Sequence, residues 1–133
     1  MNADQQDVAR KCVAAAETDS MSFPEIVGML IAAGFEGYAV DYRRATATYY
    51  LPDGDSVTFA AHAITTAVAP SFDAGRIQAA IREAQALVPG YTYRGFCEKV
   101  AAAGCAGYIV SFSGQRALYI GRTAETHTEH FPA

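Results

Sequence analysis

An internal repeat is the feature of this sequence that most constrains its fold. When the chain is aligned with itself at an offset of 70 residues, identical residues coincide at many positions. The matches are Ala32-Ala33-Gly34 with Ala102-Ala103-Gly104, Gly37-Tyr38 with Gly107-Tyr108, Val40 with Val110, Ala47 with Ala117, and Tyr49 with Tyr119. Self-similarity at a fixed spacing is typical of a duplicated structural unit. We therefore expect one domain built from two repeats, at about residues 3–62 and 73–133, joined by a connector at 63–72.

Each repeat begins with two predicted helices. They are expected at Asp4–Glu17, Pro24–Ala33, Asp73–Val88 and Arg94–Ala103. The longer helices carry apolar residues at helical spacing on one face, as a helix lying on a sheet should. Ser22, Thr92 and Asp73 are suited to cap helix N-termini, because their side chains can accept a hydrogen bond from a free backbone N–H. Gly34 and Gly104 stand where a helix would end in a left-handed residue, which glycine adopts at little cost.

Three strands follow the helices in each repeat. They are expected at Gly37–Tyr42, Thr46–Leu51, Ser56–Phe59, Gly107–Phe112, Arg116–Ile120 and Glu125–Phe131. Alternating apolar residues and the short connections at Arg43-Arg44 and Ser113-Gly114 favour antiparallel hairpins. The predicted fold class is α+β, with an internally duplicated α-α-β-β-β unit, helices packed on antiparallel sheet and a pseudo-two-fold axis. A half of about 60 residues buries too little surface to be stable alone. The halves should either join their sheets or cover each other's apolar faces.

Composition excludes several classes of function. The chain of 133 residues has a net charge of −4 and only two lysines, whereas a nucleic-acid-binding protein needs a surplus of cations. No stretch approaches the roughly 20 apolar residues of a membrane span, and the polar N-terminus lacks the features of a signal peptide. Cys12, Cys97 and Cys105 are odd in number and widely spaced, which favours buried free thiols in a reducing cytoplasm. No metal-ligand motif or cofactor-binding motif is evident, so we expect neither a metal nor a cofactor.

The last strand of each repeat differs in a way that suggests a site. In the first repeat this strand carries Val57 and Phe59 on one face, whereas the second carries His127 and Glu129 on one face. Side chains two residues apart on a strand lie on the same side, so the imidazole and the carboxylate could line a ligand pocket. His130 is a further ligand-binding candidate, although alternation places it on the other face of the strand. The alternative is structural, because charged residues on an edge strand prevent sheets from pairing with other molecules.

Two further groups are candidates for ligand binding. Tyr38 and Tyr108 follow a glycine on corresponding strands and could clamp a ligand between them, or serve as core aromatics. Four arginines near the expected hairpin turns form a candidate anion patch: Arg43, Arg44, Arg116 and Arg122. The simpler interpretation is that these arginines are solvated turn residues. The more specific one is that they bind an acidic partner or a small anion.

Several segments resemble a known family. They are Phe96-Cys97-Glu98, Ala103–Tyr108 and Gly121–Pro132 in the second half, with Phe23-Pro24-Glu25-Ile26 and Gly34–Tyr38 in the first. Together they resemble the YbcV/YdfO-like family, small bacterial and prophage-encoded proteins of unknown function that are sometimes labelled phage envelope proteins. The resemblance implies a small α+β domain without an established activity, and it offers no catalytic residues to transfer.

These observations favour a non-catalytic cytoplasmic domain that binds a small molecule or a protein partner. Exposed sheet edges would also allow a homodimer. The alternative is a small hydrolytic or metal-assisted enzyme that uses His127 and Glu129 with His130 or His62. That alternative ranks second because the sequence shows no set of nucleophile, base and orienting group.

Overall fold

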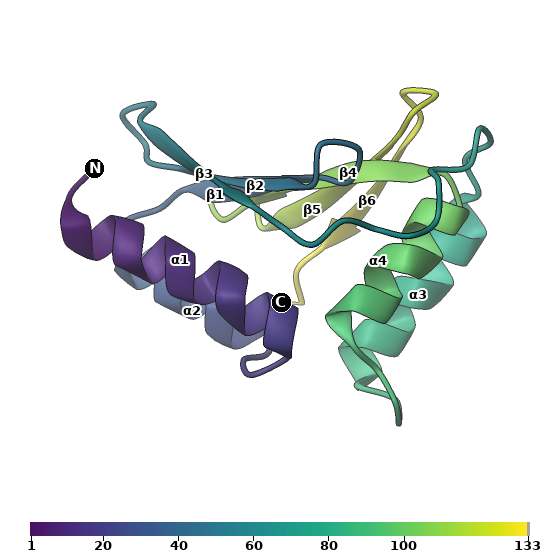
Figure 1. Cartoon of the computed structure of the whole chain (residues 1–133), viewed down its shortest axis with the longest axis horizontal. Helices are drawn as coiled ribbons and strands as arrows, with labels where there is room; N and C mark the ends of the chain where they lie inside the picture. The colour runs from purple at the N-terminus through teal and green to yellow at the C-terminus, as the bar shows by residue number, and fades with distance from the viewer. Residues whose placement is uncertain (133) are drawn as a thin grey trace.

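A computed structural model describes residues 1–132 of the chain (Figure 1). Within that range it contains four helices, α1 (Ala3–Thr18), α2 (Phe23–Ala32), α3 (Ala74–Ala86) and α4 (Tyr93–Ala102). It also contains six strands, β1 (Gly37–Asp41), β2 (Thr46–Tyr50), β3 (Ser56–Ala60), β4 (Cys105–Ser111), β5 (Arg116–Gly121) and β6 (Thr126–His130). The predicted α+β class is confirmed, and the order α-α-β-β-β occurs twice along the chain.

The helix ends follow the predicted capping residues. Ser22, Thr92 and Asp73 each accept a hydrogen bond from the backbone N–H three residues further on, at 3.3, 3.0 and 3.1 Å respectively. Gly34 and Gly104 have positive φ angles of 98° and 99°, and each directly follows the C-cap residue of a helix. These local signals therefore place both ends of α2 and α4 to within a residue.

Helix α3 is shorter than predicted. It was expected to continue to Val88, but it ends at Ala86 because Leu87 adopts a left-handed conformation with φ of 48°. A leucine rarely takes this conformation, so the sequence carried no signal for it.

The six strands form one antiparallel sheet in the order β3-β2-β1-β4-β5-β6. The halves meet at its centre, where β1 pairs with β4 and the register places Gly37 opposite Ser111 and Gly107 opposite Asp41. The halves thus join their sheets, the first of the two predicted arrangements. A Cβ atom on Gly37 would collide with the backbone carbonyl of Val110, and one on Gly107 with that of Val40.

All four helices pack on the same face of the sheet, with α1 and α2 as one pair and α3 and α4 as the other (Figure 1). The core lies between the helices and that face, and its fully buried side chains include Leu30, Ile77, Val100 and Val110. Among residues 1–132 no helix covers the opposite face, called here the open face. In the described part of the chain, no helix is both long and apolar enough to cross a membrane.

The segment between the halves packs against α4. Val68 of this connector is buried together with Ala101 and Ala106, and the Ala69 N–H donates to the Ala101 carbonyl at 3.0 Å. The Glu98 carboxylate accepts the backbone N–H groups of residues 65 and 66 at 2.7 and 3.0 Å. These hydrogen bonds stabilise its charged form and lower the pKa of Glu98 to about 2.

Candidate functional site

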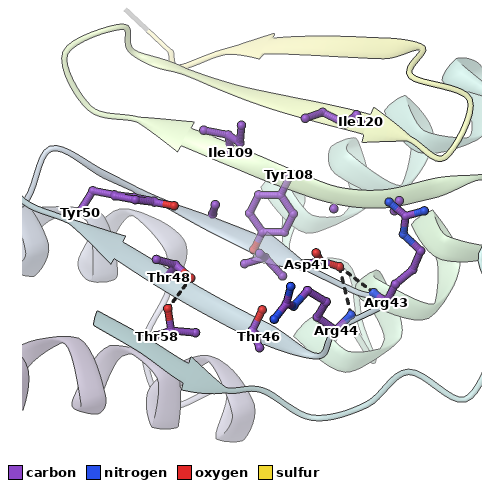
Figure 2. Close-up of a pocket in the computed structure, with 14 residues that line it drawn as sticks. Asp41, Arg43, Arg44, Thr46, Thr48, Tyr50, Thr58, Tyr108, Ile109 and Ile120 are labelled. Carbon is purple, nitrogen blue, oxygen red and sulfur yellow. Dashed lines mark hydrogen bonds between the residues drawn. The ribbon is translucent and has the colours of Figure 1, made fainter. Parts of the chain in front are cut away.

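The open face contains a hollow of about 390 Å³ over β1, β2 and β4. Small residues form part of its lining, among them Ala39, Ala106 and Gly107, while Tyr50 and Ile109 contribute larger exposed side chains. Ligand pockets in proteins have volumes of roughly 300–1,000 Å³, so the hollow matches a small molecule in size. The hollow is open to solvent. Figure 2 shows the residues that line it.

Two adjacent arginines stand at one end of the hollow, on the turn between β1 and β2. The Asp41 carboxylate accepts the backbone N–H groups of Arg43 and Arg44 at 3.0 and 3.1 Å and so fixes this turn. Figure 2 shows the two side chains diverging from the turn, with Arg44 on the side of Thr46. Both side chains are exposed, and neither guanidinium forms an ion pair within residues 1–132. The two positive charges are therefore available to an anion.

Hydroxyl groups line the hollow beside the arginines. Thr46, Thr48 and Thr58 belong to its lining, and the hydroxyl oxygens of Thr48 and Thr58 lie 2.9 Å apart in a hydrogen bond across β2 and β3 (Figure 2). On the other side of β1, Ile109 of β4 is 44% exposed. The hollow thus combines cationic groups at one end, hydroxyls along one side and apolar surface on the other.

Tyr38 and Tyr108 lie together, but within the core. Their ring centroids are 6.2 Å apart in an edge-to-face arrangement, and the Tyr108 hydroxyl lies 2.6 Å from that of Tyr93. Both tyrosines are buried on the helix side of the sheet, and burial raises their pKa values well above the ordinary value. Tyr108 also borders the hollow from below. Their side chains therefore belong to the packing that supports the hollow.

His127 and Glu129 form a half-buried pair on the helix side of β6. The imidazole Nε2 lies 2.9 Å from Glu129 Oε2, and Arg82 of α3 donates to Oε1 at 2.7 Å. Both carboxylate oxygens are thereby engaged, and the group ties the edge strand to α3. His130 lies on the opposite face of β6, where it pairs in register with Arg116. The structure thus separates His130 from the other two residues.

His62 belongs to a different group. Its backbone N–H donates to Glu17 Oε1 at 2.9 Å, and its Nδ1 lies 2.5 Å from Glu17 Oε2. Arg94 of α4 lies 3.6 Å from the same carboxylate oxygen. Because Glu17 lies in the last turn of α1 and Arg94 in the first turn of α4, this group links the two helix pairs.

The four candidate arginines divide between the two ends of the sheet. Arg116 lies opposite Ser111, which is itself opposite Gly37, so it stands at the end of the sheet away from Arg43. Arg122 donates to the Val68 carbonyl at 3.0 Å and thereby holds the connector. Arg43 and Arg44 are the pair that the structure places at the hollow.

The three cysteines are free and buried. Burial raises the pKa of Cys12 to about 11, that of Cys97 to about 12 and that of Cys105 to about 11. All three therefore remain thiols at neutral pH, which matches their predicted role as small packing residues.

Some partners at these sites were not predicted, although part of the signal for them is present in the sequence. Asp41 stands two residues before Arg43, the spacing of an aspartate that caps a turn. Strand alternation already placed Thr46 and Thr48 on the face opposite Ala47. In contrast, only the tertiary structure brings Arg82 to the Glu129 carboxylate, 47 residues away in sequence.

A known protein family matches most of this chain. The family model described as "Protein of unknown function (DUF1398)" matches residues 11–129, from α1 to β6. The chain belongs to the DUF1398 family. The matched range of this DUF1398 protein contains the hollow, both arginines of its turn and the pair formed by His127 and Glu129. No curated protein matches the chain. The family description assigns no activity, so a functional proposal depends on the geometry of the site.

Proposed function

We propose that this DUF1398 protein is a non-catalytic binding domain and that its ligand is a small molecule bearing a carboxylate or phosphate group. The ligand would occupy the hollow of the open face, with its anionic group at Arg43 and Arg44. The observation that carries this proposal is that the consecutive residues Arg43 and Arg44 present two guanidinium groups at the hollow's end, neither of which has an ion-pair partner within residues 1–132.

The chemistry of the guanidinium group supports an anion. Its planar fork of N–H donors matches the oxygens of a carboxylate or phosphate, and such charge-assisted hydrogen bonds are about twice as strong as neutral ones. Two neighbouring guanidinium groups also repel each other, and a bound anion removes that repulsion. The rest of the molecule would lie against Ile109 and Tyr50, whose exposed apolar surfaces it would cover.

The corresponding turn of the second half supports a single orientation for the ligand. There, between β4 and β5, Ser113 and Gly114 stand where the first turn has Arg43 and Arg44. The first turn thus carries two arginines, whereas the second is flanked only by Arg116, whose Nε donates to the Gly114 carbonyl. An elongated anion would bind with its charged end at the first turn.

The experiment is an NMR titration of the labelled protein with phenyl phosphate, benzoate and neutral benzyl alcohol. We expect the two anions, but not the alcohol, to shift amide signals of residues 39–48 and 107–109. The double substitution Arg43→Ser and Arg44→Gly, which copies the turn of the second half, should weaken phenyl phosphate binding at least 10-fold. Arg116→Ser is the matched control and should leave it unchanged. Equal binding by the double variant would refute the proposal.

A second candidate, a small hydrolytic enzyme, has one observation in its favour. The 2.9 Å contact between His127 and Glu129 is the spacing at which a carboxylate orients an imidazole for proton transfer. However, Arg82 occupies the other carboxylate oxygen, so the arrangement equally serves to anchor β6. We rank binding first for this reason.

The remaining sequence-based expectations fit the same proposal. A cytoplasmic location agrees with three free, buried thiols. Duplication of an ancestral unit agrees with the twofold occurrence of α-α-β-β-β. A homodimer would use the free edges of β3 and β6, the outermost strands of the sheet. The YbcV/YdfO-like name and its prophage origin stay predictions.

A further inference from the structure

Helix α2 presents apolar side chains to solvent. Its ten residues include a single charged side chain, that of Glu25, and Ile31 is 53% exposed. Phe23 is 45% exposed and packs on one side against the Phe131 ring, at 5.8 Å between ring centroids. Helix α4, the second helix of the other half, carries Arg94, Glu98 and Lys99 and buries most of its apolar residues. The outer side of α2 thus has the character of a helix surface that another segment covers.

The connector shows how such a surface is covered on α4. Ala101 is the third residue before the glycine that follows α4, and it is fully buried beneath Val68. Its carbonyl accepts the N–H of Gly104 and also the N–H of Ala69 in the connector. Ile31 is the third residue before the glycine that follows α2. Its carbonyl accepts the Gly34 N–H, and its side chain is exposed.

Several carboxylates stand near the C-terminal end of α2. Gln5 of α1 donates to the Ala33 carbonyl, which places the neighbouring Asp4 close to this end. The Glu36 N–H donates to the carbonyl of Tyr50, the last residue of β2, and the turn that follows Tyr50 carries Asp53. None of the three carboxylates forms an ion pair within residues 1–132, and the nearby amino group of residue 1 pairs with Asp55. The partial negative charge of a helix C-terminus adds to this field.

We infer that the C-terminal end of α2 binds a short, extended segment of a partner protein that carries an apolar residue next to a lysine or arginine. The apolar residue lies on Ile31 as Val68 lies on Ala101, and a backbone N–H of the segment donates to the Ile31 carbonyl. The basic side chain reaches Glu36 or Asp53. This site is on the helix side of the molecule and is independent of the hollow on the open face.

The size of the surface favours a short segment over a second copy of the chain. A helix of this length extends about 15 Å, so an exposed stripe about 10 Å wide covers roughly 150 Å². A stable dimer buries about 800 Å² on each partner. The stripe is too small to hold two folded copies together, whereas an extended segment of four to eight residues would cover it.

The test uses two synthetic peptides with the sequence of residues 63–72, one extended by two lysines and the other by two glutamates. Added to the labelled protein, the lysine peptide should shift amide signals of residues 29–36, and the glutamate peptide should not. Ile31→Ser should weaken binding of the lysine peptide at least fivefold. Leu87→Ser is the matched control, because Leu87 is 63% exposed at the end of α3, and it should have no effect.

Three results would overturn the inference. The first is equal binding of both peptides, which would remove the role of charge. The second is the absence of shifts in residues 29–36, or shifts in α4 or the open face instead. The third is a concentration-dependent dimer, measured by light scattering, that Ile31→Ser dissociates, since the occupant would then be a second copy. None of these depends on whether phenyl phosphate binds the hollow.

Discussion

The two halves of the chain use the same order of elements, and three of the differences between them bear on binding or on the edge of the sheet. The central turn carries Arg43-Arg44 in one half and Ser113-Gly114 in the other. The edge strand carries Val57 and Phe59 in β3, and His127 and Glu129 in β6. The outer side of the second helix is exposed in the first half (α2), whereas the connector covers it in the second half (α4).

Residues that build the sheet are shared, and the differences lie at its surface or edge. Tyr49 lies opposite Val57, and Tyr119 lies opposite His127, so both edge strands have the same register despite their different side chains. Positions that differ without changing the backbone are free to serve binding. This is why the hollow's arginines and the α2 surface, rather than the shared core, carry the two proposals.

The largest effect is expected where the halves meet. Gly107→Ala should destabilise the protein by about 3 kcal/mol or more, because the added Cβ collides with the Val40 carbonyl and the central strands must move apart. Gly37→Ala should destabilise the protein in the same way, because its added Cβ collides with the Val110 carbonyl. Urea denaturation followed by circular dichroism measures both.

Gly28→Ala supplies the control for these variants. Gly28 lies in α2 with no atom within 4 Å of an added Cβ, so alanine should stabilise the helix by up to about 1 kcal/mol. If Gly107→Ala were as stable as the wild type, β1 and β4 would not approach as closely as described. Losses of very different size in Gly37→Ala and Gly107→Ala would break the correspondence between the halves.

A smaller effect is expected from exchanging the edge-strand residues. The double substitution Val57→His and Phe59→Glu should destabilise the protein by about 2 kcal/mol, because it removes two apolar side chains that pack against the core. Arg10, which lies over the Phe59 ring at 5.5 Å, is the cation available there. The change in unfolding free energy is measured by urea denaturation.

The reverse double substitution, His127→Val and Glu129→Phe, should leave the stability unchanged or stabilise the protein by about 1 kcal/mol. A half-buried ion pair contributes little over apolar residues of similar size. A large loss in this second variant would instead show that the pair with Arg82 holds β6 in place, and the edge strands would differ in how they are anchored.

Sequence patterns predicted the local structure well, but they predicted the contacts between distant elements poorly. Caps such as Ser22 and turn glycines such as Gly34 act within a few residues, so their effects could be predicted from spacing. The side on which His127 lies followed from alternation. Its partner Arg82 did not, because a contact between α3 and β6 depends on how the helices pack.

The candidate site followed the same division. Arg43 and Arg44 were predicted as part of an anion patch from their place at a turn, and the same pattern grouped them with Arg116 and Arg122. Arg122 lies at the same end of the sheet as Arg43, but its guanidinium donates to the Val68 carbonyl, whereas Arg116 lies at the other end. Adjacent strands of an antiparallel sheet run in opposite directions, so consecutive turns alternate between ends, and β1 and β4 oppose each other as well. The hollow itself arises from the uncovered sheet face, which no local pattern reveals.

The smallest effect is expected at Glu98, which has no counterpart in the first half because Gly28 stands at the corresponding position of α2. Its carboxylate accepts the backbone N–H groups of the connector, and these lower its pKa from about 4.5 to about 2. Glu98→Gln should therefore destabilise the protein by about 1 kcal/mol at pH 7, a value reduced by exposure to solvent.

The pH dependence distinguishes this role from simple packing. A carboxylate with a lowered pKa in the folded state contributes its full stabilisation above about pH 4.5 and loses it as the pH falls toward 2. The difference in unfolding free energy between wild type and Glu98→Gln should thus be constant from pH 7 to 5 and close between pH 4.5 and 2. Urea denaturation at each pH measures it. A difference that persists unchanged at pH 2.5 would mean that Glu98 holds the connector through packing rather than through its charge.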